Sequence, residues 1–154
     1  MSKALLETFY RAFRDRDAAT MAACYHDDAR FSDPVFPELD AAGVRDMWTM
    51  LLSGAQDLRV ESGGVEADAA HGRAHWDARY TFPATGRPVL NRVDSTFEFR
   101  DGLIVGQRDD FSFHHWAAQA LGLTGRLLGG TRFLQRKVQA QGARRLAQWR
   151  QRQR

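Results

Sequence analysis

The spacing of apolar residues changes near residue 58, and this change constrains the fold more than any other feature of the chain. Before it, apolar residues recur about every three to four positions, as on one face of a helix. From residue 58 to residue 113 they alternate with polar residues, as on a strand with one buried face. The sequence therefore predicts an α+β fold in which helices cover one side of a curved sheet.

Helical spacing marks three segments in the first third of the chain, residues 5–13, 17–25 and 43–52. Asp17 is suited to cap the second of these helices, and residues 26–28 are predicted to end it. Residues 29–33 alternate like a short strand, which is expected to stop at Pro34 because proline has no backbone donor.

Three antiparallel strands joined by tight turns are predicted at residues 74–82, 91–99 and 103–113. Residues 59–65 are predicted only to lead into a turn. Helical spacing returns at residues 116–123 and again in an amphipathic helix at residues 133–149. The glycines between these two helices are predicted to form a loop: Gly125, Gly129 and Gly130.

The length and composition are those of one globular domain with a sizeable core, since 44% of the 154 residues are hydrophobic and 27% are charged. Cys24 is the single cysteine, which excludes an internal disulfide and a multi-cysteine zinc site and favours a reducing, cytoplasmic location. No apolar run approaches the roughly 20 residues of a membrane helix, and the first residues lack the apolar segment of a secretory signal. No membrane partner is therefore expected.

The net charge of +3 hides an asymmetry. Asp110 is the last acidic residue, and nine Lys or Arg residues follow it, whereas the first 110 residues carry 13 basic and 19 acidic groups. Such a basic tail raises the question of nucleic acid or anionic lipid as a partner. The alternative is a C-terminal helix that packs on the acidic body or on a second subunit. This alternative is favoured, because nothing else in the tail is typical of a nucleic-acid module, and no specific nucleic-acid binding is predicted.

Four short patterns resemble a known family when they are taken in order: Phe9-Tyr10 followed by Asp17, then residues 25–35, 97–104 and 108–111. They are similar to the nuclear transport factor 2 superfamily, in its SnoaL-like and ketosteroid-isomerase-like branch. The resemblance implies a cone-shaped, curved, mostly antiparallel sheet wrapped by the N-terminal helices. Residues 1–113 would form this core domain, and residues 114–154 a helical extension packed on the core or on a dimer partner.

Asp33 is the first candidate catalytic residue. The resemblance places it at the position of the ketosteroid isomerase general base, and its apolar neighbours would raise its pKa by desolvation. The alternative is an aspartate that only turns the chain before Pro34.

Asp109 is the second candidate, because it shares a predicted strand face with Val105, Gln107 and Phe111. The resemblance implies that this face lines a pocket and that a catalytic aspartate stands on or near this strand. The alternative is a salt bridge to Arg79 or Arg108.

The candidate pocket-lining residues are mainly aromatic: Phe9, Tyr10, Trp48, Trp76, Tyr80, Asn91, Ser95, Phe97 and Phe111. They favour an apolar ligand, although the same pattern also fits an ordinary core. The resemblance places the tyrosine of the isomerase's oxyanion hole at Phe9 and its aspartate at Ser95. Because neither residue matches, steroid isomerase activity is not expected.

No cofactor or metal is expected, since His114 and His115 are adjacent and lack a third ligand.

Three functions remain open. The chain is a SnoaL-like enzyme for proton transfer, cyclisation or water addition, a non-catalytic module that binds an apolar metabolite, or a dimeric interaction protein with a basic C-terminal helix. An open cavity with converging carboxylates would favour the first, and a cone filled by side chains the third. A homodimer is predicted through the polar face of the sheet.

Overall fold

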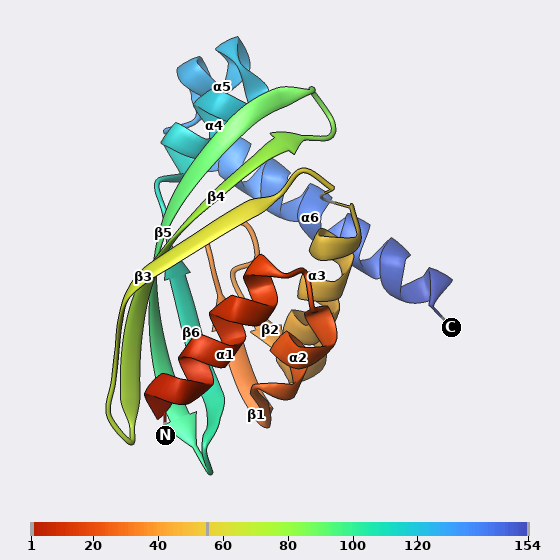
Figure 1. Ribbon diagram of the computed structural model, residues 1–154. Coiled ribbons are helices and arrows are strands. Elements are labelled where there is room, and N and C mark those ends of the chain that lie inside the picture. The colour runs from red at the N-terminus through yellow and green to blue at the C-terminus, as the bar shows by residue number, and fades with distance from the viewer. Residues whose placement is uncertain (1, 55, 154) are drawn as a thin grey trace.

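The computed structural model describes residues 2–54 and 56–153, and it has the α+β architecture that the spacing predicts (Figure 1). The helices are α1 (Ser2–Arg14), α2 (Ala18–Ala23), α3 (Ala41–Gly54), α4 (Phe113–Leu121), α5 (Leu123–Leu128) and α6 (Arg132–Arg152). The strands are β1 (Tyr25–Ser32), β2 (Leu39–Asp40), β3 (Arg59–Ala67), β4 (His71–Phe82), β5 (Arg87–Arg100) and β6 (Leu103–Asp110).

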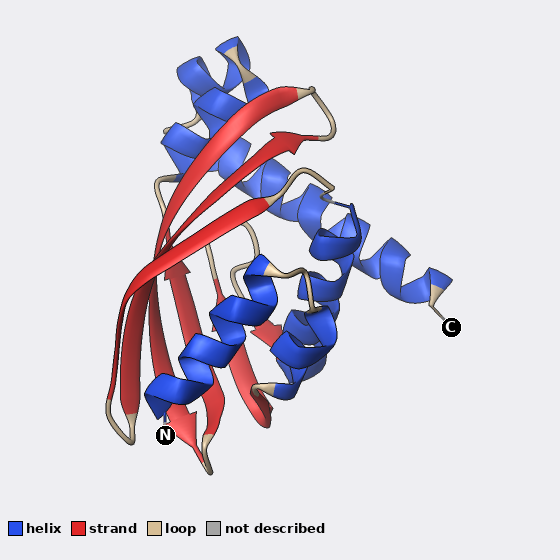
Figure 2. Cartoon of the chain, viewed as in Figure 1, coloured by secondary structure: helices blue, strands red, loops and turns tan. Residues whose placement is uncertain are grey.

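The six strands form one curved, mixed sheet in the order β2-β1-β6-β5-β4-β3. Strands β3 to β6 pair antiparallel as a meander, and β1 pairs parallel with β6. Helices α1 and α3 lie against the concave side of the sheet, and α6 runs across its open side (Figure 2). The cone-shaped, mostly antiparallel sheet is thereby confirmed, together with the C-terminal helix.

Three predicted elements were wrong in detail. Strand β1 begins at Tyr25, so residues 26–28 belong to a strand, because Tyr25 pairs with Ile104 of β6. Residues 59–65 form most of β3, an edge strand whose side chains are largely exposed and therefore lack a clear alternating pattern. Gly125 lies inside α5 rather than in a loop.

The predicted inward face of β6 is also corrected at one residue. The pairing of β5 with β6 shifts register between Glu98 and Phe99, which marks a bulge. Because of this shift Ile104 is fully buried, while Val105 is only half-buried. Gln107 and Asp109 keep the inward direction that the sequence predicts.

The buried side chains form two neighbouring clusters. The larger lies between α1, α3 and the sheet, at the inner end of the cone. The smaller joins α4 and α6 to β5 at the other end of the cone, which we call the mouth. Val35, Tyr80 and Phe111 pack against both clusters, so they lie between the inner end and the mouth.

The convex face of β4 and β5 carries the polar residues for which a dimer contact is predicted: His75, Asp77, Arg79, Thr81, Arg92, Asp94, Thr96 and Glu98. On this face His75 bridges two carboxylates, at 2.7 Å from Asp77 and 2.9 Å from Asp94. The homodimer stays a prediction.

Each helix within residues 2–54 and 56–153 is too short or too polar to cross a lipid bilayer.

Candidate functional site

A buried carboxyl group stands in the middle of the sheet, at Asp109 of β6. Asp109 is only 2% exposed and pairs across the ladder with Ser95 of β5. The Ser95 hydroxyl donates to Oδ1 of Asp109 at 2.6 Å, and the Gln107 amide donates to the same oxygen at 3.0 Å. Both hydrogen bonds end on Oδ1, which leaves Oδ2 without a side-chain donor from the residues described.

Two chains of hydrogen bonds lead to this oxygen. In the first, the Trp76 indole N–H donates to Ser95 Oγ at 2.9 Å. In the second, the Trp48 indole donates to the Tyr25 hydroxyl at 2.8 Å, and Tyr25 donates to Gln107 Oε1 at 2.5 Å. Every donor in both chains is oriented toward Asp109, so the network fixes this carboxyl as the final acceptor.

Burial sets the protonation of this carboxyl. Desolvation raises the pKa of Asp109 from 3.8 to about 7, partly offset by the hydrogen bonds from Ser95 and Gln107. The charge of Asp33 raises the pKa further. A carboxyl with a pKa near neutrality can act as an acid or as a base at physiological pH.

The Tyr10 hydroxyl is buried nearby without a partner. Across the described part of the chain, it is the single fully buried side-chain N or O atom that makes no hydrogen bond. Burial raises the pKa of Tyr10 well above its ordinary value, the charge of Asp109 adds to this effect, and the nearby Ser95 hydroxyl opposes it. An unpaired buried hydroxyl costs free energy, so this group is available to a ligand or to a bound water.

Asp33 lies at the mouth of the cone, directly after β1. Its Oδ1 accepts from the backbone amides of Val35 at 2.7 Å and Phe36 at 2.6 Å, so this oxygen holds the turn around Pro34. The turn-forming role that the sequence left open is therefore present. Burial nevertheless raises the pKa of Asp33 to about 6, against the lowering effect of the two amides.

The salt-bridge alternative for Asp109 does not fit the geometry. Arg108 points to the other side of the strand, where its guanidinium lies 3.7 Å from the Asp110 carboxylate. The polar partners that Asp109 has among the residues described are Ser95 and Gln107.

The residues predicted to line a pocket fall into two groups. At the inner end, Phe9, Tyr10, Trp48, Trp76, Ser95 and Phe97 are buried. Their rings pack edge to face, for example Phe9 and Trp48 with centroids 6.3 Å apart, so much of the predicted lining is also core. At the mouth, Tyr80, Asn91 and Phe111 are half-buried, and Tyr80 accepts from the Trp116 indole at 2.8 Å.

The site contains Tyr25, which the sequence did not indicate as a site residue, and Gln107, which the sequence placed on the pocket face without a role. The sequence predicts Tyr25 at the end of a helix, whereas it is the first residue of β1. Gln107 precedes Asp109 by two residues on the same strand face, and a buried Gln beside a buried Asp is the signal that could have identified it.

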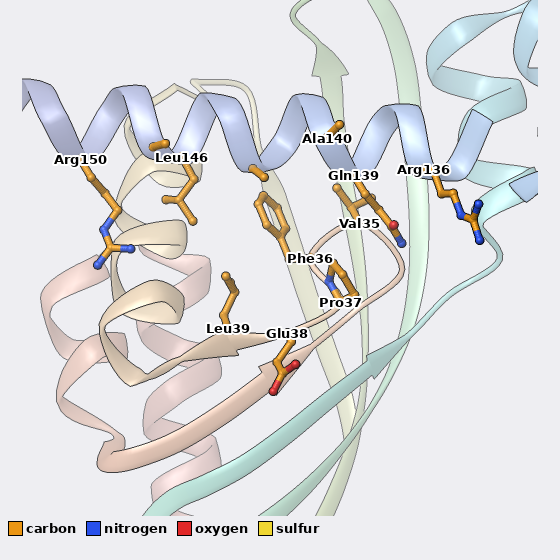
Figure 3. A pocket seen from close by; sticks show the side chains of 12 residues that line it. Val35, Phe36, Pro37, Glu38, Leu39, Arg136, Gln139, Ala140, Leu146 and Arg150 are labelled. Carbon is orange, nitrogen blue, oxygen red and sulfur yellow. The ribbon is translucent and has the colours of Figure 1, made fainter. Parts of the chain in front are cut away.

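A pocket of about 560 Å³ lies outside the cone, between α6 and residues 35–39 (Figure 3). Its floor includes Phe36 and Leu146, and Arg136 and Arg150 lie toward its two ends. No residue of the Asp109 network contributes to the wall of this pocket.

Within the described residues there is no group of three His, Cys, Asp or Glu side chains arranged to hold a metal ion.

The family model of the SnoaL-like domain matches residues 6–107. No curated protein matches the sequence at a significant level. An LEH-like epoxide hydrolase from M. tuberculosis is similar in structure, with a TM-score of 0.65 and 21% identity over 82% of this chain and 95% of that chain.

Two Streptomyces proteins are similar to the same extent. IdmH from Streptomyces antibioticus, a candidate polyketide cyclase, has a TM-score of 0.65 and 21% identity over 80% of this chain and 99% of that chain. AclR from Streptomyces galilaeus, a candidate hydroxylase, has a TM-score of 0.64 and 18% identity over 82% of this chain and 96% of that chain. At these identities the likeness concerns the fold.

Proposed function

Because the chain belongs to the SnoaL-like domain family, we propose that it binds a small apolar metabolite inside the cone and exchanges a proton with it through Asp109. The observation that carries the proposal is the buried Asp109 carboxyl, whose donors all approach Oδ1 while Oδ2 receives none from the described residues. The similar structures, which include a candidate cyclase, a candidate hydroxylase and an epoxide hydrolase, support a reaction on a small molecule.

The surroundings of Asp109 favour an apolar ligand with one polar group. The side chains near the network are aromatic, so a ring or a short hydrocarbon would make apolar contacts there. The free Tyr10 hydroxyl would donate a hydrogen bond to an oxygen of the ligand. A carbonyl compound has both features that this site can address.

The proposed step is removal of a proton from the carbon next to a carbonyl group. The ionised Asp109 accepts this proton on Oδ2, the C–H electron pair moves into the enolate, and the charge collects on the carbonyl oxygen. Tyr10 stabilises that oxygen by donating its hydrogen bond. Returning the proton to another carbon of the enolate system completes an isomerisation. In a cyclisation the enolate carbon attacks a second carbonyl, a C–C bond forms as the C=O π bond breaks, and the resulting alkoxide takes the proton from Asp109.

Asp33 is proposed as the second acid or base, at the mouth. Its Oδ1 is occupied by the turn, so only Oδ2 would contact a ligand. Its charge also raises the pKa of Asp109, which links the two carboxyls electrostatically.

A dimeric interaction protein with a basic C-terminal helix is the second candidate. The close packing of the aromatic side chains at the inner end favours it, because a filled cone leaves less room for a ligand.

The proposal is tested by deuterium exchange. A small cyclic ketone such as 2-tetralone is incubated with the protein in D₂O, and NMR follows loss of the protons next to the carbonyl. We expect the wild type to accelerate exchange and Asp109→Asn to lose at least about 100-fold of that acceleration. Asp110→Asn is the matched control, because Asp110 is the adjacent carboxyl on the exposed face. Equal exchange in the wild type and Asp109→Asn would contradict a proton-transfer role.

A further inference from the structure

The end of the molecule formed by α5 and the first turn of α6, residues 123–133, exposes large apolar side chains. We call this region the α5–α6 tip, and α5 forms an extremity of the molecule in Figure 1. Its apolar residues are Leu123 (70% exposed), Leu127 (71%), Leu128 (40%) and Phe133 (70%). Elsewhere in the described residues, Leu51 is the one large apolar side chain with comparable exposure.

The packing of α5 fixes these side chains toward solvent. A Cβ on Gly125 would collide with the Ala117 carbonyl oxygen, so α5 contacts α4 directly through its backbone. Leu123 and Leu127 are each two residues from Gly125, which is roughly 200° around the helix. They therefore point away from the protein. Thr131 donates through its backbone and its hydroxyl to the Leu128 carbonyl, which joins the two helices by a tight turn.

Basic side chains surround this apolar surface. Arg126 and Arg132 lie within the tip and are exposed, and Arg136 and Lys137 follow on the next turn of α6. No acidic residue occurs after Asp110. The tip is thus apolar and positively charged.

The exposed apolar and basic side chains of the tip favour one kind of binding partner over the others. A second copy of the same tip would bring Arg126 and Arg132 against like charges, which disfavours self-association here. Nucleic acid would pair with the arginines but leave four large apolar side chains in water. The interface of an anionic membrane accepts apolar side chains among its acyl chains and basic side chains at its headgroups.

We propose that the α5–α6 tip binds peripherally to lipid surfaces that carry anionic headgroups. The sequence predicted no membrane partner because it has no spanning apolar run, but peripheral binding requires none. The tip shares no residue with the Asp109 network, so this proposal stands independently of the proposed function.

The test is co-sedimentation of the full-length protein with vesicles of phosphatidylcholine alone and of phosphatidylcholine mixed with phosphatidylglycerol. We expect binding to the mixed vesicles that weakens as salt is added. Arg126→Gln and Arg132→Gln should each weaken it about fivefold, and Leu123→Ser with Leu127→Ser about tenfold or more. The matched controls are Leu51→Ser in α3 and Arg11→Gln in α1, which should bind like the wild type.

Three results would overturn the proposal. The first is the absence of binding to the mixed vesicles at low salt, and the second is binding that the tip variants retain in full. The third is self-association of the wild type without lipid that Leu123→Ser with Leu127→Ser abolishes, because the tip would then be a contact between two copies. Because all substituted leucines and arginines are exposed, the circular dichroism spectrum and melting temperature of each variant should match the wild type.

Discussion

The inner end of the cone and its mouth each hold one carboxyl group, but they hold it in opposite ways. Asp109 lies within a strand, and its two donors are side chains of β5 and β6, Ser95 and Gln107. Those donors are held in turn by the Trp76 indole of β4 and, through Tyr25 of β1, by the Trp48 indole of α3. Asp33 lies in a turn, and its donors are backbone amides two and three residues further along the chain. The inner carboxyl therefore depends on the whole fold, whereas the outer one depends mainly on local structure.

The two ends also differ in what covers them. The inner end is covered by α1 and α3, which lie largely within the family match at residues 6–107. The mouth is closed by α4 and α6, which lie outside the family match at residues 6–107. Gln135 and Gln139 of α6 donate to the Pro34 carbonyl at 3.1 and 3.0 Å, next to the Asp33 turn. The C-terminal helix is therefore the element most suited to control access to the site.

The largest effect should follow removal of α6. Deleting residues 131–154 removes three buried side chains, Leu134, Val138 and Leu146, and exposes the apolar surface that they cover. Each large side chain contributes roughly 1.5–3 kcal/mol by burial, so the melting temperature should fall by many degrees. Calorimetry of the truncated chain measures the loss.

A point variant keeps this test informative if the shortened chain does not fold. Leu146→Ala should cost about 2–5 kcal/mol, and Phe133→Ser, at an exposed position of the same helix, should cost little. An unchanged melting temperature in Leu146→Ala would show that α6 does not stabilise the core domain. The predicted division into residues 1–113 and 114–154 would then describe two independent parts.

The next effect is a dependence of stability on pH that originates at the inner end. The pKa of Asp109 is raised from 3.8 to about 7, so the unfolded chain releases this proton at lower pH than the folded chain. The stability contribution is fully present below about pH 4 and is lost as the pH rises to about 7. At about 1.4 kcal/mol per pKa unit, the loss between about pH 5 and pH 7 is on the order of 3 kcal/mol.

Asp109→Asn should flatten this dependence, since an amide oxygen still accepts from Ser95 and Gln107 but carries no titrating proton. Urea denaturation at several pH values measures the slope. Asp110→Asn, on the opposite face, removes only the smallest of the effects that raise the pKa of Asp109, so the slope should decrease only slightly. The raised pKa of Asp33, about 6, gives a slope of the same sign at lower pH. A slope between about pH 6 and 7 that persists unchanged in Asp109→Asn would therefore mean that the Asp109 carboxyl is not its source.

The sequence predicted the frame of the fold well where one face of an element is buried. The change of spacing near residue 58 identified helices before strands, and alternation placed Trp76, Ser95 and Phe97 on the concave face. The Asp109 direction was also predicted correctly, because its neighbours two residues away along the strand are apolar or amide side chains.

The sequence could not predict features that depend on pairing between distant segments. Strand β3 is an edge strand with little burial, so it has no alternating pattern to detect. Because of the bulge opposite Glu98, Ile104 rather than Val105 points to the inner face. This depends on the pairing register of β5 and β6, which the sequence pattern of β6 alone does not contain. The hydrogen bond from Tyr25 to Gln107 joins residues 82 positions apart, and its formation required β1 to begin earlier than its composition suggested.

The smallest effect should come from the Asp33 turn at the mouth, and it tests whether the two ends are linked. Asp33→Asn keeps an oxygen that can accept from the Val35 and Phe36 amides, whereas Asp33→Ala removes it. The alanine variant should therefore lose about 1 kcal/mol and the asparagine variant less, as measured by urea denaturation. Equal losses in both variants would show that the oxygen that accepts from the two amides contributes little to stability.

Both substitutions remove the negative charge at the mouth, and this charge raises the pKa of Asp109. The pKa of Asp109, followed by carbon-13 NMR of its carboxyl group, should therefore fall in both variants, whatever happens to the turn. An unchanged Asp109 pKa would mean that solvent between the two carboxyls screens their interaction. A fall would show that the locally built mouth tunes the protonation of the inner carboxyl, even though the two groups share no hydrogen bond.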